Sequence, residues 1–105
     1  MKSITPAELK ARLDRGDRIV LLDVREPAEQ RLAALPGARL LPMSEAWRRV
    51  DELDADEEMV VFCHHGIRSA HLIGHLETRG FARLLNLRGG IDAWSCEVDP
   101  SVPRY

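Results

Sequence analysis

The residues best suited to chemistry stand in one run, Cys63-His64-His65-Gly66-Ile67-Arg68-Ser69. A cysteine thiolate is a nucleophile, and Gly66 lets the chain after it curl so that successive N–H groups point inward. Arg68 adds a permanent positive charge with several donors, and His64 and His65 add partial charge near neutral pH. We therefore predict a nucleophilic Cys63 in an anion-binding loop whose substrate contacts come from His64, His65, Gly66, Ile67, Arg68 and Ser69.

A junction between a strand and a helix is expected to position this cysteine. The continuous apolar run at 59–62 predicts a strand buried on both faces, and residues 68–79 predict a helix closed by Gly80. Ligands of parallel α/β sheets bind beyond the carboxyl ends of strands, where a following helix presents free N–H groups and its positive dipole end. Both effects stabilise a thiolate, so we expect the pKa of Cys63 to lie below that of a free thiol.

The remaining elements follow from capping residues and apolar runs. Thr5, Pro6 and Glu8 form a capping box with proline at the first helical position, which predicts a first helix that ends near Gly16. Other expected elements are strands at 18–24, 39–41 and 84–87, and helices at 27–32, 44–53 and 91–95. Strands that alternate with helices predict an α/β domain with a mostly parallel sheet.

Three further features complete the expected fold. The segment 35–38, Leu-Pro-Gly-Ala, predicts a type II turn, and the tail from Val98 is expected to be extended because it carries two prolines. Ser44 is expected to cap the helix at 44–53, with Trp47 and Val50 facing inward, and Trp94 is also assigned to the core.

Length and composition predict one ordinary globular domain over residues 1–105. Hydrophobic residues make up 45% and charged residues 30%, and 15 basic and 17 acidic residues give a net charge of −2. No basic block indicates nucleic acid, and no apolar run approaches the roughly 18 residues that a membrane span needs. The first residues lack the apolar segment of a secretory signal, so a cytoplasmic location is expected.

The loop resembles the active-site loop of the rhodanese-like sulfurtransferases, which has the form C-x-x-G-x-[RS]-S. Three other segments, 21–27, 35–38 and 86–94, resemble further motifs of that family in the same order. The resemblance implies a single domain with a parallel five-stranded sheet flanked by helices, and a Cys63 that carries sulfur as a persulfide without a cofactor.

The resemblance also implies the reaction partners. The expected donor is a small sulfur-containing anion such as thiosulfate, or a persulfide, and the acceptor is a thiol or a protein. We expect a monomer or a weak homodimer, with no nucleic acid and no membrane. Asp23 and Arg25 match the family's D-x-R and are interpreted as structural supports, whereas Ala33-Ala34 replaces the Gly-His that many members carry before the turn.

Two alternative functions remain open. Cysteine-dependent phosphatases and arsenate reductases place arginine six positions after the nucleophile, as C-x5-R. Here Arg68 follows Cys63 by five positions, which favours the sulfur-transferring branch. A non-catalytic or regulatory module that binds a protein partner is the other alternative, because a fold does not dictate a function.

Metal and disulfide chemistry are not expected. His71 and His75 have helical i, i+4 spacing, but no third ligand accompanies them, so both are predicted to face solvent. Nothing in the sequence brings Cys96 near Cys63, so Cys96 is interpreted as incidental rather than as a resolving thiol.

Overall fold

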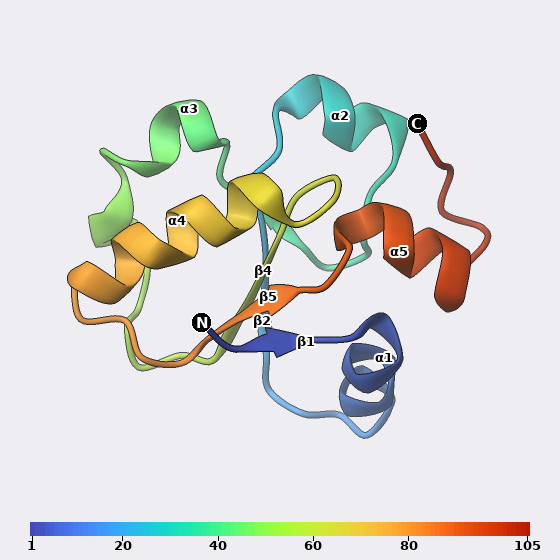
Figure 1. Ribbon diagram of the computed structural model, residues 1–105, viewed down its shortest axis with the longest axis horizontal. Coiled ribbons are helices and arrows are strands. Elements are labelled where there is room, and N and C mark those ends of the chain that lie inside the picture. Colours follow the sequence, from blue (N-terminus) through green and yellow to red (C-terminus); the bar gives the residue numbers. More distant parts are fainter.

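Five strands form one parallel sheet in the computed structural model, which describes residues 1–105 (Figure 1). The order across the sheet is β1-β5-β4-β2-β3. The strands are β1 (Ser3–Ile4), β2 (Val20–Asp23), β3 (Arg39–Leu40), β4 (Met59–Phe62) and β5 (Leu84–Leu87). The helices are α1 (Pro6–Asp14), α2 (Pro27–Leu32), α3 (Met43–Ala46), α4 (Ile67–Thr78) and α5 (Gly90–Glu97), with a 3-10 turn at Val50–Glu52.

The central strand β4 separates two hydrophobic cores. Met59, Val61 and Cys63 point into a core that also receives residues of α3 and α4. Val60 and Phe62 point to the opposite face, into a core that receives residues of α1 and α5. Successive strand residues face opposite sides, so a strand covered on both faces needs an unbroken apolar run. This arrangement confirms the predicted buried strand and an α/β fold with a parallel sheet.

Local signals located most of the elements correctly. The capping box of α1 is present, with the Thr5 N–H donating to Glu8 at 2.8 Å and the Glu8 N–H donating to Thr5 Oγ1 at 3.1 Å. The helix at 27–32 and the strand at 84–87 have the predicted bounds. The two-residue strand β1 was not predicted from its own residues because it is too short to show a pattern, and α5 extends beyond the predicted 91–95.

The predicted helix over 44–53 is wrong. Helix α3 begins at Met43, before Ser44, and ends at Ala46. At Arg49 the backbone leaves helical geometry (φ −112°, ψ 18°), and the following 3-10 turn directs Val50 into the core. Trp47 is 43% exposed rather than in the core, and its ring packs edge-on against His75 of α4. Trp47 therefore contacts the neighbouring helix at the protein surface, whereas Val50 lies in the core as predicted.

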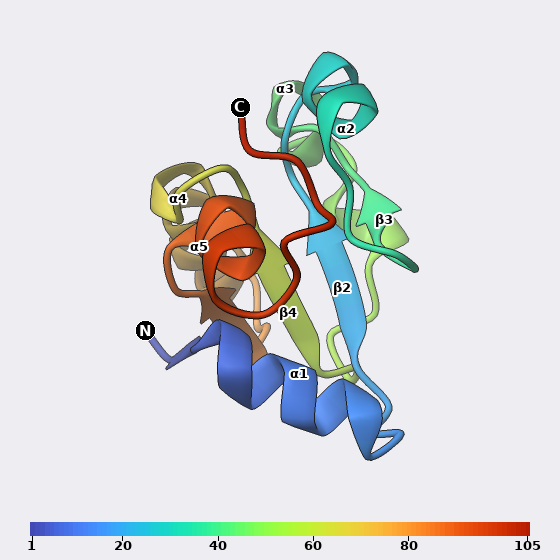
Figure 2. The ribbon, with the colours of Figure 1, turned by 90° about the vertical axis from the view of Figure 1, so that its right-hand side faces the viewer.

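The chain beyond α5 returns toward α2. Val102 is buried, and Ser95 of α5 donates a hydrogen bond to its carbonyl. The C-terminus then lies beside α2, as Figures 1 and 2 show, where the Tyr105 hydroxyl donates to Glu29 Oε1 at 3.0 Å. None of the helices combines the length and apolar composition needed to cross a bilayer.

Candidate active site

Cys63 follows the last residue of β4 and lies almost wholly inside the protein, at 1% exposure. Its Sγ accepts hydrogen bonds from the N–H of Gly66 at 3.1 Å and from the N–H of Ser69 at 3.4 Å. The Ser69 hydroxyl also lies 3.4 Å from Sγ. The loop thus curls around the sulfur as predicted, and its donors converge on Sγ itself.

Two opposing effects set the acidity of this thiol. Burial is the largest single effect, and it raises the pKa because a charge is poorly solvated inside the protein. The Ser69 hydroxyl and the N–H groups of Ser69, Gly66 and His65 oppose it by hydrogen bonding to the thiolate. Together they outweigh burial, so the pKa of Cys63 lies below its ordinary value.

Gly66 and Asn86 hold the loop in this shape. Gly66 caps α4 with φ +102°, a left-handed conformation that favours glycine, and in this conformation its N–H faces Sγ. The Asn86 side chain, from β5, donates to the Gly66 carbonyl at 3.1 Å and accepts from the Ser69 hydroxyl at 2.6 Å. Our sequence reasoning did not single out Asn86, although asparagine is depleted in strands and a polar residue in this one was a signal.

The start of α5 approaches the backbone of the same loop. The N–H of Ile91 donates to the Cys63 carbonyl at 3.0 Å, and the N–H of Asp92 donates to the His64 carbonyl at 3.1 Å. A Cβ atom on Gly90 would lie 2.4 Å from the His64 carbonyl oxygen. The turn at Gly89-Gly90 therefore does more than join a strand to a helix, because it lets α5 support the loop directly.

Arg68 differs from the expectation of a free anion-binding group. Its guanidinium donates two parallel hydrogen bonds to the Glu29 carboxylate of α2, each at 2.7 Å. Arg68 lowers the pKa of Glu29 to about 2, so this carboxylate is ionised at neutral pH. The tertiary structure brings a counter-ion to Arg68 from a distant segment, and the spacing within the loop gave no indication of it.

His64 also differs from expectation. The His64 ring stacks on Tyr105, with centroids 3.8 Å apart and an interplanar angle of 6°. Burial, and then repulsion from His65, lower the pKa of His64, so its neutral form is favoured at neutral pH. His64 therefore contributes an aromatic surface rather than the partial charge expected from its residue type.

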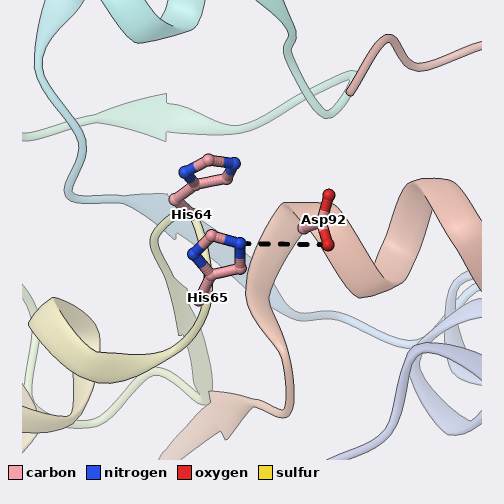
Figure 3. Close-up of side chains that lie close together, drawn as sticks. All are labelled: His64, His65 and Asp92. Atoms are coloured by element: carbon pink, nitrogen blue, oxygen red, sulfur yellow. Dashed lines mark ion pairs between the residues drawn. The ribbon is translucent and has the colours of Figure 1, made fainter. Parts of the chain in front are cut away.

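His64 and His65 of the loop form a cluster with Asp92 of α5 (Figure 3). Their candidate ligand atoms lie within 4.8 Å of one another, and His65 Nε2 is 3.9 Å from Asp92 Oδ2. The two imidazole rings are stacked at 28°, so their in-plane lone pairs run side by side instead of converging on one point. Arg104 also holds both oxygens of Asp92, at 2.9 and 3.3 Å. The ion pair of this cluster that does not depend on a histidine proton is therefore Arg104–Asp92.

Asp23 and Arg25 form a buried ion pair at the end of β2. The guanidinium donates to both Asp23 oxygens, at 2.9 and 2.7 Å, and the two side chains are 1% and 0% exposed. Arg25 also donates to the carbonyl of Ala33 at 2.8 Å and to the Tyr105 hydroxyl at 3.0 Å. The pair joins β2 to the segment after α2 and to the C-terminal tail.

The remaining predicted residues lie around this centre. Ile67 is 69% exposed on the surface of the loop. His71 faces solvent as predicted, whereas His75 is partly buried because α3 brings Trp47 against it. Cys96 is free and exposed near the end of α5. The surface hollows, of about 170 to 320 Å³, are lined by residues outside the 63–69 loop.

A parallel α/β sheet with a cysteine loop at the carboxyl end of its central strand can be compared with known proteins. The family model of the rhodanese-like domain matches residues 5–97, and the chain belongs to this family. A rhodanese-related protein from Thermoplasma volcanium superposes with a TM-score of 0.87 at 30% identity, covering 100% of both chains. These matches confirm the predicted family and fold.

Two relatives of different length are also similar to this chain. A sulfurtransferase of Allochromatium vinosum is 37% identical over 102 residues, which cover 97% of this chain and 95% of that protein. The probable adenylyltransferase/sulfurtransferase MoeZ of Mycobacterium tuberculosis is 35% identical over 105 residues. That match covers 98% of this chain but only 27% of MoeZ, so this chain corresponds to one part of that longer protein.

Proposed function

We propose that this protein is a sulfurtransferase that carries a sulfane sulfur as a persulfide on Cys63. The observation that carries the proposal is the ring of donors around Sγ, at the carboxyl end of β4, which favours the thiolate despite its burial. The family supports sulfur transfer as the reaction class. The proposed donor is thiosulfate or a persulfide, and the proposed acceptor is a thiol or another thiophile.

The reaction has two balanced steps of nucleophilic substitution. The Cys63 thiolate attacks the outer sulfur of the donor, so that an Sγ–S bond forms as the S–S bond of the donor breaks. The bonding pair leaves with sulfite when the donor is thiosulfate, or with a thiolate when it is a persulfide. The acceptor then attacks the outer sulfur of the Cys63 persulfide, and the Sγ–S pair returns to Cys63 as the thiolate. No external oxidant or reductant is needed.

The loop has a separate part in each step. Before transfer, the N–H groups of Gly66 and Ser69 stabilise the attacking thiolate. After transfer, the negative charge resides on the outer sulfur, and the same donors face the persulfide. Asn86 keeps the donors in place through the Gly66 carbonyl and the Ser69 hydroxyl.

The test is the mass of the intact protein after treatment with thiosulfate or an alkyl persulfide. We expect the mass of one added sulfur atom, lost on addition of cyanide with release of thiocyanate. Cys63→Ser should take up no sulfur, and Cys96→Ser is the matched control because it removes the other, exposed thiol. Full sulfur transfer by Cys63→Ser would refute the mechanism.

The same assay separates the alternative functions. A binding module would show negligible turnover with every sulfane donor together with saturable binding of a partner. A phosphatase would hydrolyse a generic aryl phosphate faster than it transfers sulfur. Either result would replace the proposed function.

A further inference from the structure

Three arginines around the Cys63 loop are each paired with a carboxylate, which compensates the positive charge of the guanidinium. These arginines lie on α4, after β2 and in the C-terminal tail, and the shortest hydrogen bond of each to its partner is 2.7 to 2.9 Å. The pairs are Arg68–Glu29, Arg25–Asp23 and Arg104–Asp92. The permanent positive charge that Arg68 was expected to add to the loop is therefore compensated, as are those of the two neighbouring arginines.

The pair of Arg68 with Glu29 is the one that bears on the loop itself. Each terminal nitrogen of the guanidinium donates to a different carboxylate oxygen at 2.7 Å, the paired geometry in which arginine and carboxylate interact most strongly. The Arg68 side chain is 38% exposed and that of Glu29 is 20% exposed, so the pair lies at the protein surface. The Tyr105 hydroxyl adds a further hydrogen bond to Glu29, at 3.0 Å.

The rest of the loop does not replace the lost charge. The N–H groups of Gly66 and Ser69 already point to Sγ. His64 favours its neutral form and is stacked on Tyr105, and Ile67 is 69% exposed. The exposed surface of the loop thus combines the apolar side chain of Ile67 with the imidazole of His65, which is 59% exposed, and its arginine is already paired.

We infer that Glu29 determines which charge class of sulfur donor this protein accepts. By pairing with Arg68, Glu29 disfavours a dianion such as thiosulfate, which has to compete for the guanidinium. It leaves organic persulfides, whose reacting end carries at most one charge and whose carbon side can contact Ile67 and Tyr105, as the favoured donor class. This inference rests on the proposed sulfur transfer and adds a specificity-determining residue to it.

A charge series tests this role. Glu29→Gln frees Arg68 but keeps an amide oxygen for the capping bond that Glu29 accepts from the Glu26 N–H at 3.1 Å. We expect Glu29→Gln to raise the ratio of kcat/KM for thiosulfate to kcat/KM for cysteine persulfide at least tenfold, through a lower KM for thiosulfate. The double variant Glu29→Gln/Arg68→Ala should return the ratio to the wild-type range. Arg68→Ala alone should lower this donor ratio, because the substitution leaves the negative charge of Glu29 unpaired and this charge repels thiosulfate.

Glu58→Gln is the matched control. Glu58 makes the same two-bond pair with Arg12, at 2.6 and 2.9 Å, but it precedes β4 whereas Cys63 follows that strand. Glu58→Gln changes the net charge by the same amount as Glu29→Gln, but at the opposite end of the sheet. We therefore expect the donor ratio of Glu58→Gln to stay at its wild-type value. An equal rise in Glu58→Gln and Glu29→Gln would overturn the inference, since the effect would then come from total charge.

A second measurement uses the unaltered protein and does not depend on the folding of a variant. Between about 0.01 M and 1 M salt the Debye length falls from about 30 Å to about 3 Å. With Arg68 already paired, the KM for thiosulfate should change less than about twofold across this range. A tenfold rise would show a free cation at the site and overturn the inference. If neither donor loads Cys63 with sulfur, the proposed function fails, whereas normal loading with an unchanged ratio in Glu29→Gln refutes only the role of Glu29.

Discussion

The close approach of α5 to the Cys63 loop can be tested by adding a single methyl group, the side chain of alanine, at Gly90. Gly90 has φ +64°, and a Cβ at this position would lie 2.4 Å from the His64 carbonyl oxygen and 2.6 Å from that of Cys63. Backbone atoms cannot move aside as a flexible side chain can. Gly90→Ala must therefore displace either α5 or the loop that positions the nucleophile.

The expected magnitude has two parts. Placing alanine in a left-handed conformation costs roughly 1–2 kcal/mol, and forcing an extra methyl group into a packed site costs about 1–3 kcal/mol. Gly37→Ala is the matched control, because Gly37 has φ +79° but its Cβ would meet nothing within 4 Å. Gly37→Ala carries the first penalty alone, so Gly90→Ala should be less stable than it by about 1–3 kcal/mol.

The measurement is urea unfolding of both variants, combined with the rate at which iodoacetamide alkylates Cys63. With an m-value of about 1–3 kcal/mol/M, the extra penalty lowers the urea midpoint of Gly90→Ala by roughly 1 M relative to Gly37→Ala. The alkylation rate should change at least about threefold in folded Gly90→Ala and keep its wild-type value in Gly37→Ala. Equal midpoints and equal rates would show that α5 does not hold the loop in place.

Two further substitutions probe the groups that stabilise the site. Ser69→Ala should raise the pKa of Cys63, because it removes a hydroxyl that lowers this pKa, and the midpoint of the pH–alkylation curve should move upward. Because the folded-state pKa is depressed, ionisation of Cys63 stabilises the fold above the unfolded-state pKa, and this stability is lost as the pH falls through the folded-state pKa. Asp23→Asn should lower the free energy of unfolding by about 3–5 kcal/mol, because it leaves Arg25 buried without a counter-ion.

A contradicting outcome can be stated for Ser69→Ala, and a control variant is available for Asp23→Asn. An unchanged midpoint in Ser69→Ala would mean that in the wild type the Ser69 hydroxyl donates its proton to Asn86 Oδ1, at 2.6 Å, rather than to Sγ, at 3.4 Å. Glu45→Gln breaks an ion pair with Arg49 whose side chains are 40% and 32% exposed, and it should change the stability by less than about 1 kcal/mol. A loss of less than about 1 kcal/mol in the free energy of unfolding of Asp23→Asn would contradict the structural role of the buried pair.

Local signals explain why most elements could be predicted. A capping box acts over three residues and an apolar run over four, so α1 and β4 are visible in short stretches of sequence. The prediction of a helix over 44–53 was wrong because the helix ends at Ala46 and the backbone at Arg49 is non-helical, and the segment contains no proline or glycine that would have signalled this break. Strand β1 is two residues long and pairs with β5 far along the chain, so it too lay beyond local reasoning.

The sequence by itself determined the candidate nucleophile and the shape of its loop. Cys63, Gly66 and Ser69 lie within six positions, so the curl that brings two N–H groups to Sγ is a local property. Only the tertiary structure decided the charge of that loop. Glu29 is 39 residues from Arg68, and it reaches the guanidinium because the parallel sheet brings the chain after β2 beside the chain after β4. Ion pairs depend on distance in space, and the spacing of residues along the chain does not determine that distance.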